Sequence, residues 1–225
     1  MSTRADRLPL HARTARPRRA ALRRYQDGPK RRLDIAGVLL MAPLALPLIA
    51  VLWLLVRLDG GPGFFGHWRV GRDGRAFRCW KLRSMVPDAE ARLEALLASD
   101  PLLRAEWRAG FKLTRDPRVT RLGRFLRKTS LDELPQLWNV LRGEMSLVGP
   151  RPVPRAELAA YGGYAWAYLE CRPGLTGLWQ VSGRNDTSYE ERIRLDVSYL
   201  ARAGLGTDLA ILARTPLAVI GCTGR

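Results

Sequence analysis

A run of uncharged, mostly apolar residues near the N-terminus constrains this chain of 225 residues most strongly. It extends over 22 residues, from Ile35 to Val56, and reads IAGVLLMAPLALPLIAVLWLLV. As a straight helix it would be about 33 Å long, which is enough to cross the hydrocarbon core of a bilayer. The simplest interpretation is therefore one transmembrane helix.

Two prolines inside this run favour a helix that turns back. Pro43 and Pro47 lie about one helical turn apart, and each removes a backbone donor and clashes with the preceding turn. Three basic residues precede the run and Arg57 follows it, so both ends suit the cytoplasmic side of a membrane. We therefore expect a re-entrant membrane hairpin over residues 33–58, broken at Pro47. A spanning helix and a buried helix of a soluble domain remain open alternatives.

The charge of the chain is strongly positive and unevenly distributed. The net charge is +17, and residues 1–32 contain eleven Lys and Arg against two Asp. Such a surface favours anionic partners, namely nucleic acid, anionic lipid or phosphorylated small molecules. Because residues 1–32 have few large apolar side chains, we expect this basic arm to be largely disordered.

Cysteine and histidine are too few and too scattered to indicate a metal site or a disulfide framework. The chain has three cysteines, Cys79, Cys171 and Cys222, and two histidines, His11 and His67. None of them has the spacing of a zinc site. We expect the cysteines to be reduced thiols in a cytosolic setting.

The part of the chain after the apolar run predicts a mixed fold. Phe64–Val70 and Ala76–Leu82 alternate as strands around the turn sequence GRDG, which predicts a β-hairpin. Residues 87–109 have apolar side chains at helical spacing, with an interruption near Pro101. The apolar stretch Leu205–Val219 is too short and interrupted to span a bilayer. The expected class is α+β, mainly helical.

A basic amphipathic helix is predicted between residues 114 and 130. Val119, Leu122, Phe125 and Leu126 form one apolar stripe, surrounded by Arg118, Arg121, Arg124, Arg127 and Lys128. This pattern suits a helix that lies on an anionic membrane or borders a phosphate site. A surface helix of a soluble protein fits the segment equally well.

Asp132 and Glu133 form an acidic pair within this basic region. The sequence SLDE matches a capping box, with Ser130 as the N-cap and Glu133 three residues later. A chemical interpretation stands beside this structural one. An ionised carboxylate can act as a nucleophile, two adjacent carboxylates can bind Mg²⁺, and nearby arginines can hold phosphoryl oxygens. Together these groups would make a phosphoryl-transfer site.

Ordered motifs then relate the chain to a known family. They are KRRLD, GGPGFF, RVGRDGRAF, KLRSM, TRDPRVTRLGRFLRKTSLDELPQLWNVLRGEMSLVGPRP, RPGLTGLWQVSGR and LDVSYL, and they extend from about Lys30 to Thr215. With these motifs the chain resembles the bacterial sugar transferase family, the small monotopic polyprenyl-phosphate phosphoglycosyl transferases. Three residues depart from the family pattern: Gly66 and His67 stand where Arg-Gln is common, and Leu46 stands where serine is common.

The resemblance implies a reaction at the cytoplasmic face of the bacterial inner membrane. A sugar 1-phosphate would pass from a UDP-sugar to undecaprenyl phosphate, giving undecaprenyl-diphosphate-sugar and UMP. The mechanism would be ping-pong, through a covalent phosphosugar-aspartate, with Mg²⁺ as cofactor. Such a reaction initiates the assembly of exopolysaccharide, capsule or O-antigen glycans.

The resemblance also implies roles for individual residues. Asp132 would be the nucleophile and Glu133 its partner, and the pair would bind Mg²⁺, with the direct ligand left open. Pro47 matches the helix-breaking proline of the membrane hairpin. The substrate and phosphate contacts would be made by Lys81, Arg83, Arg127, Arg151, Arg172, Gln180 and Arg184.

The chain thus divides into the arm of residues 1–32, the membrane hairpin of residues 33–58 and a cytoplasmic catalytic domain of residues 59–225 with interfacial helices. The expected partners are the two substrates and anionic membrane lipids, and nucleic acid is not among them. A membrane-tethered nucleic-acid binder and an inactive scaffold are the competing interpretations. The sequence leaves open which sugar is transferred and whether the protein is a homodimer.

Overall fold

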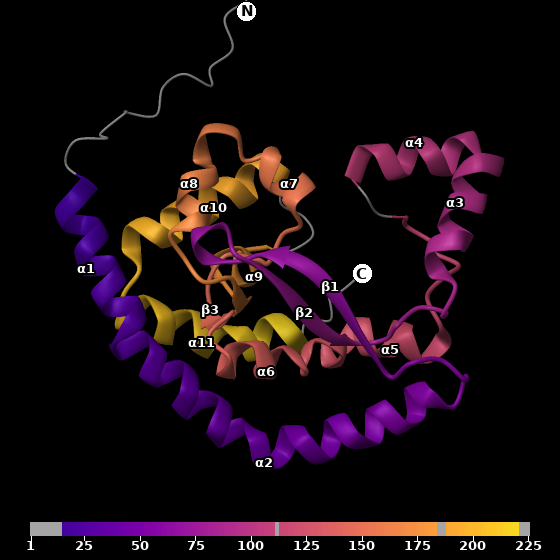
Figure 1. Cartoon of the computed structure of the whole chain (residues 1–225), viewed down its shortest axis with the longest axis horizontal. Helices are drawn as coiled ribbons and strands as arrows, with labels where there is room; N and C mark the ends of the chain where they lie inside the picture. The colour runs from indigo at the N-terminus through magenta and orange to yellow at the C-terminus, as the bar shows by residue number, and fades with distance from the viewer. Residues whose placement is uncertain (1–14, 111–112, 184–187, 221–225) are drawn as a thin grey trace, which may run out of the picture.

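The computed structural model describes residues 15–110, 113–183 and 188–220, so the first 14 residues of the basic arm lie outside it. Most of the described chain is helical, and the helices surround two small sheets (Figure 1). The helices are α1 (Ala15–Asp27), α2 (Pro29–Arg57), α3 (Ala89–Ser99), α4 (Pro101–Gly110), α5 (Arg121–Thr129), α6 (Gln136–Leu141), α7 (Arg155–Ala159), α8 (Ala165–Leu169), α9 (Leu178–Val181), α10 (Tyr189–Arg202) and α11 (Leu205–Ile220). The strands are β1 (Phe64–Val70), β2 (Ala76–Leu82), β3 (Ser146–Val148) and β4 (Gly174–Thr176), and short 3-10 turns are η2 (Arg72–Gly74), η3 (Leu131–Glu133) and η4 (Gly162–Tyr164).

Helix α2 contains the whole apolar run and both of its prolines. Its backbone stays helical from Pro29 to Arg57, so the expectation of a break at Pro47 is wrong. Figure 1 instead shows α1 and α2 as one long bow beneath the rest of the molecule, with its lowest point in α2. A proline removes one backbone hydrogen bond, whereas the bonds on either side remain, and the helix bends without ending.

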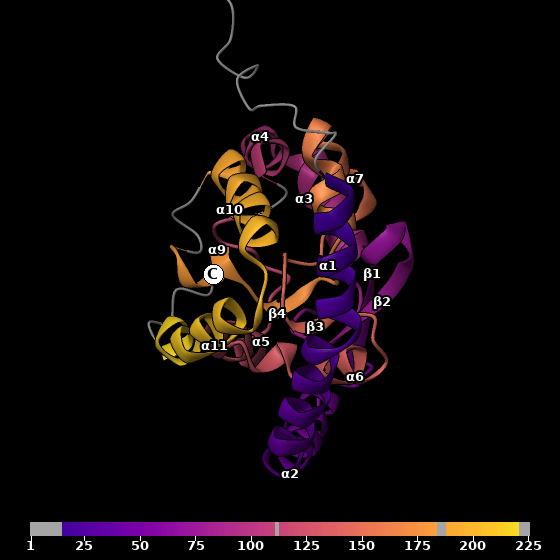
Figure 2. The same cartoon turned by 90° about the vertical axis from the view of Figure 1, so that its left-hand side faces the viewer.

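The apolar side chains of α2 mostly face away from the rest of the protein. Leu40 and Leu44 are 84% and 79% exposed, and the large apolar side chains at positions 39, 46, 51, 54, 55 and 58 are exposed as well. Figure 2 shows α2 projecting below the domain. The helical run Arg19–Arg57 is long and apolar enough to cross a membrane, by length and composition. So large an exposed apolar surface is typical of membrane or partner contact, and it is consistent with membrane association of α2.

Residues 15–27 and 29–32 are helical, in contrast to the expectation that the basic arm is largely disordered. Their charged and polar side chains bind partners that lie far away in the sequence. Lys30 is buried and pairs with the Asp208 carboxylate of α11. The same carboxylate accepts hydrogen bonds from the hydroxyls of Tyr25 and Tyr199, at 2.7 and 2.8 Å. These contacts offset the charge repulsion along the segment and attach it to the domain.

Strands β1 and β2 form the predicted hairpin, with the predicted bounds. They pair antiparallel over their whole lengths. Asp73 and Gly74 in the turn have φ angles of 58° and 78°, the left-handed backbone that tight hairpin turns require. Side chains alternate along β2, so Lys81 lies on the same face as the buried Phe77 and Cys79. The hairpin therefore directs Lys81 toward the interior of the molecule.

A second sheet, which the sequence analysis did not predict, lies at the centre of the domain. Strands β3 and β4 pair in parallel, and a Cβ added to Gly174 would come within 2.1 Å of the Gly149 nitrogen. The two backbones can approach this closely only because glycine has no side chain. Strands of three residues are too short to give a recognisable period-2 pattern. The main core cluster packs around this sheet and includes Val38, Leu137, Val140, Met145, Leu147, Val148, Tyr199 and Ile211.

The predicted interruption at Pro101 is confirmed. The amphipathic helix predicted between residues 114 and 130 is present as α5, but it begins only at Arg121, so Arg118 and Val119 precede it. Pro101 starts α4, and Asp100 Oδ1 accepts hydrogen bonds from the amides of Leu102 and Leu103 at 2.8 and 3.2 Å. The Thr120 side chain caps the start of α5. Helices α3 and α4 pack against each other to the right of the hairpin in Figure 1.

Candidate active site

The acidic pair lies in η3, the tight turn that joins α5 to α6. Ser130 has a left-handed backbone, with φ 58° and ψ 17°, and ends α5. Its side chain makes no capping hydrogen bond, so the capping-box interpretation of SLDE is wrong. Residues Leu131–Glu133 form only a 3-10 turn, and the next α-helix starts at Gln136. The two carboxylates are therefore positioned by the turn between α5 and α6 and not by the start of a helix.

Lys81 of the hairpin contacts both carboxylates. Its Nζ lies 2.6 Å from Glu133 Oε1 and 3.7 Å from Asp132 Oδ2. The side chains of Lys81 and Glu133 are 32% and 36% exposed, whereas that of Asp132 is only 9% exposed. The structure thus brings together three residues that are up to 52 positions apart in the sequence. Asp132 is the most enclosed of the three.

The charge of Asp132 depends on its basic neighbours. Burial raises the pKa of Asp132, and so does the charge of Glu133, whereas the charges of Lys81 and Arg127 lower it. The net shift of the pKa is upward. Burial lowers the pKa of Lys81, but Glu133 and Asp132 outweigh burial, so its pKa is raised and it stays cationic. Lys81 and Arg127 therefore favour the ionised carboxylate, the form that a nucleophile needs.

Arg127 of α5 provides a second cation beside Asp132. Its Nε donates a hydrogen bond to Ser84 Oγ at 2.9 Å, which orients the guanidinium. Burial lowers the pKa of Arg127, whereas Asp132 and then Asp116 raise it. Sequence reasoning gave Ser84 no role, although the residue lies inside the KLRSM motif. We interpret it as the group that orients Arg127.

Asp132 and Glu133 are the residues that could hold a magnesium ion. Among the residues that the structure describes, no group of three or more His, Cys, Asp or Glu could hold a metal. Mg²⁺ is commonly bound by one or two carboxylates together with phosphate oxygens and water. The adjacent carboxylates of Asp132 and Glu133 meet this requirement.

Arg83 does not join this site, in contrast to the expectation. Its side chain is 5% exposed and pairs with Asp59, just beyond the end of α2. Its guanidinium also donates to the backbone carbonyls of Pro62, Met85 and Val56, at 2.6, 2.8 and 3.1 Å. With these partners Arg83 attaches the end of the apolar helix to the hairpin.

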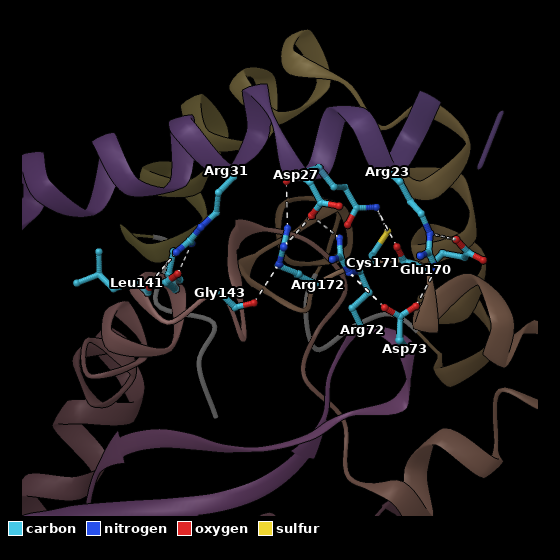
Figure 3. Close-up of polar contacts among 12 residues, drawn as sticks. Arg23, Asp27, Arg31, Arg72, Asp73, Leu141, Gly143, Glu170, Cys171 and Arg172 are labelled. Carbon is cyan, nitrogen blue, oxygen red and sulfur yellow. Dashed lines mark hydrogen bonds and ion pairs between the residues drawn. The ribbon is translucent and has the colours of Figure 1, made fainter. Parts of the chain in front are cut away.

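Arg172 is also engaged elsewhere (Figure 3). It donates to the carbonyls of Gly143 and Gln26, both at 3.0 Å, and to Asp27 Oδ1 at 2.8 Å. Asp27 accepts a second hydrogen bond from Arg72 of the hairpin turn, also at 2.8 Å. Arg172 therefore joins the end of α1 to the domain, and its contact with a nucleotide sugar stays a prediction.

The KRRLD motif has a similar anchoring role, which sequence reasoning did not assign. Arg31 donates to the carbonyl of Leu141 at the end of α6 (Figure 3). Asp34 accepts from Ser146 Oγ and from the Leu147 amide, each at 2.9 Å. The motif attaches the start of α2 to the central sheet.

Two of the remaining expected site residues lie in a separate region around α9. Arg151 follows β3, and its guanidinium lies 5.5 Å from the centre of the Trp179 ring. Gln180 is the next residue of α9, and its buried Oε1 has no hydrogen-bond partner in the described part of the chain. Arg184 lies outside the described residues, so its role stays a prediction.

Comparisons with known proteins agree with the resemblance. A family model described as bacterial sugar transferase matches residues 25–222. A UDP-galactose-lipid carrier transferase of Erwinia amylovora is 56% identical over 186 residues, which are 83% of this chain and 39% of that protein. An undecaprenyl-phosphate galactose phosphotransferase of Salmonella typhimurium is 52% identical over 191 residues, 85% of this chain and 40% of that protein.

A third relative has a similar length to this chain. The exopolysaccharide production protein ExoY of Rhizobium meliloti is 48% identical over 191 residues, which are 84% of each chain. In contrast, the chain spans only about two fifths of the length of the first two relatives.

Proposed function

This chain belongs to the bacterial sugar transferase family, and from that premise we propose that it transfers a sugar 1-phosphate from a UDP-sugar to undecaprenyl phosphate. The products would be undecaprenyl-diphosphate-sugar and UMP, and the reaction would initiate exopolysaccharide, capsule or O-antigen assembly. The relatives' names support a lipid-carrier substrate, and two of them mention galactose. The observation that carries the proposal is the enclosed Asp132 carboxylate with Lys81 Nζ at 3.7 Å.

In the first half-reaction, an Asp132 oxygen attacks the phosphorus that carries the sugar. The bond from this phosphorus to the bridging oxygen of the diphosphate breaks, and UMP leaves with that oxygen. The product on the enzyme is a phosphosugar-aspartate. Lys81 and Arg127 are placed to stabilise the negative charge that develops on the phosphoryl oxygens, as fixed cations do in phosphoryl transfer.

In the second half-reaction, a phosphate oxygen of undecaprenyl phosphate attacks the same phosphorus. The bond to Asp132 breaks, which restores the free carboxylate and releases undecaprenyl-diphosphate-sugar. Asp132 and Glu133 would hold Mg²⁺, which when bound supplies positive charge against the phosphate oxygens. Arg151 and Gln180 remain candidate donor contacts, whereas Arg83 and Arg172 have anchoring roles.

The exposed apolar surface of α2 supports a site at the membrane surface. The exposed apolar surface of the bow would insert into one leaflet, with both ends of the helix on the cytoplasmic side of the inner membrane. Its basic flanks suit anionic headgroups. Lys30 and Arg83 attach the two ends of α2 to the domain, so the catalytic residues would lie at headgroup depth, where a lipid phosphate can reach them.

The test uses purified full-length protein in nanodiscs with Mg²⁺, undecaprenyl phosphate and a panel of UDP-sugars. We expect UMP release with one sugar, and a phosphosugar adduct by intact-mass spectrometry when the lipid is omitted. Asp132→Asn should lose both signals, because the amide is not a nucleophile. Asp88→Asn is the matched control, since Asp88 is an exposed acid that pairs with Arg92 on the surface. Folded, membrane-bound protein that releases no UMP would favour an inactive scaffold.

A further inference from the structure

Two arginines flank the indole of Trp179 from different elements. The guanidinium carbons of Arg151, after β3, and Arg192, in α10, lie 5.5 and 4.9 Å from the centre of the Trp179 ring. Trp179 is only 7% exposed. Cations at such distances from an aromatic ring are held in place by its electrons. The indole therefore fixes the positions of two guanidinium groups.

A third arginine, Arg69, lies on the hairpin beside the segment that carries Arg151. The amide of its neighbour Val70 donates to the carbonyl of Val153 at 3.0 Å. The Tyr168 hydroxyl bridges the two segments, because it donates to the Val70 carbonyl at 2.6 Å and accepts from the Val153 amide at 3.1 Å. These bonds bring β1 next to the segment that carries Arg151. Arg69, Arg151 and Arg192 are called the arginine cluster below.

The arginine cluster has no directly paired acid within residues 15–110, 113–183 and 188–220. None of its three guanidinium groups makes a hydrogen bond or an ion pair there. Two buried donors also have no acceptor in these ranges, namely Arg192 Nε and Trp179 Nε1. Buried donors are nearly always paired in folded proteins. Unpaired donors beside unpaired cations indicate a ligand with anionic oxygens.

The members of the cluster also repel one another. Burial lowers the pKa of Arg69 and of Arg192, and the charge of Arg151 lowers both further. The acids near them, Glu157 and Asp196, are too few to balance three cations, and Asp196 is already the acceptor for the Tyr161 hydroxyl. A phosphate group would remove this repulsion and supply acceptors to the free donors.

We propose that the arginine cluster and Trp179 Nε1 bind the nucleoside monophosphate part of the sugar donor, the part that leaves as UMP. This inference rests on the proposed function, because that reaction supplies a donor of this class. It adds Arg69, Arg192 and Trp179 to the site.

The position of the cluster favours the soluble donor over the lipid phosphate. Helix α10, which carries Arg192, lies on the opposite side of the molecule from the bend of α2 in both views (Figures 1 and 2). On the hairpin, Arg69 pairs with Phe77, four residues along β2 from Lys81. This separation is about 13 Å along the strand. Arg69 and Lys81 lie on the same face of the hairpin, and both side chains are long, so their cationic groups can approach the two adjacent phosphates of one nucleotide sugar.

The test measures binding of UMP to the purified full-length protein by isothermal titration calorimetry. We expect Arg192→Gln and, independently, Arg69→Gln to weaken UMP binding by at least about tenfold, since each removes hydrogen bonds to a charged phosphate. The matched control is Arg194→Gln, an exposed arginine on the same helix, which should bind UMP like the wild type. Thermal unfolding of each free variant checks that it is folded.

Steady-state kinetics separate the two substrates. In the cluster variants the KM for the UDP-sugar should rise and the KM for undecaprenyl phosphate should stay unchanged. A rise in the lipid KM alone would assign the cluster to the lipid phosphate and overturn the proposal. Wild-type protein that does not bind UMP, or folded variants that bind it normally, would also overturn it. Wild-type protein that binds UMP through the cluster but releases none from any UDP-sugar would refute the proposed function and leave this site standing.

Discussion

The buried carboxylate of Asp196 should make the stability of this protein depend on pH. Asp196 lies in α10, is 3% exposed, and accepts a hydrogen bond from the Tyr161 hydroxyl at 2.8 Å. Burial raises its pKa from 3.8 to about 7, although the hydrogen bond from Tyr161 and the charges of Arg151 and Arg192 act in the opposite direction. The folded protein therefore holds a proton at Asp196 under conditions in which the unfolded chain has lost it.

The sign and the size of the effect follow from this difference in pKa. Between the two pKa values, 3.8 and about 7, the folded state binds more protons than the unfolded state, so stability falls as the pH rises. The contribution is fully present below the lower value and is lost above the higher one. The whole difference corresponds to about 4 kcal/mol, of which about 2.5 kcal/mol falls between pH 5 and pH 8. For a chain of this length, the latter amount corresponds to a change in Tm of roughly 5–10 °C.

Asp196→Asn removes the titration and keeps an acceptor for Tyr161. The Tm is measured by thermal unfolding in detergent at pH 5, 6, 7 and 8. Between pH 5 and pH 8, the Tm of the wild type should fall by roughly 5–10 °C more than the Tm of this variant. Asp88→Asn is the control, because Asp88 is exposed and the pKa of its carboxyl is lowered, outside this pH range. If the Tm difference between the wild type and Asp196→Asn is the same at every pH, the carboxyl of Asp196 does not titrate in this range and the reasoning fails.

Three further perturbations test the assigned roles. Arg172→Ala should lower the free energy of unfolding by about 1–3 kcal/mol, measured by denaturant titration, because it frees α1; a higher KM for the UDP-sugar with unchanged stability would contradict the anchoring role. Lys81→Met should raise the pKa of Asp132 and move the acidic limb of the pH–rate profile for UMP release to higher pH, whereas an unshifted limb would exclude this electrostatic role. Gly123→Ala places a Cβ 1.9 Å from a backbone oxygen and should destabilise the protein by about 1–3 kcal/mol, whereas Gly163→Ala, with nothing within 4 Å, is the control. Equal Tm values for these two alanine variants would refute the clash.

Local patterns in the sequence were sufficient for the elements whose cause is local. The alternation around GRDG predicted the hairpin with its observed bounds, because a tight turn and a period of two depend only on neighbouring residues. Pro101 predicted the division between α3 and α4 for the same kind of reason. The apolar run of α2 was also evident, as was the acidic pair at Asp132 and Glu133.

Other features depended on partners far away in the sequence. Ser130 matched a helix-starting signature, but the preceding helix ends there and the chain turns tightly. Tertiary packing therefore determined the backbone at this position, and the local motif did not. The basic residues from 15 to 32 suggested disorder because their partners, such as Asp208, lie more than 170 positions away. The parallel β3–β4 pair joins two strands that are too short to show a recognisable pattern in the sequence.

The roles of the basic residues show the same division most clearly. The sequence by itself determined that many cations would stand near an acidic pair, and the family motifs indicated which ones to consider. Only the tertiary structure decided that Lys81 meets Asp132 and Glu133, whereas Arg83 and Arg172 donate to Asp59, Asp27 and backbone carbonyls. The physical reason is that an arginine has the same chemistry in an anchor and in a binding site. Its role depends on which acceptors the folded chain brings within hydrogen-bond distance.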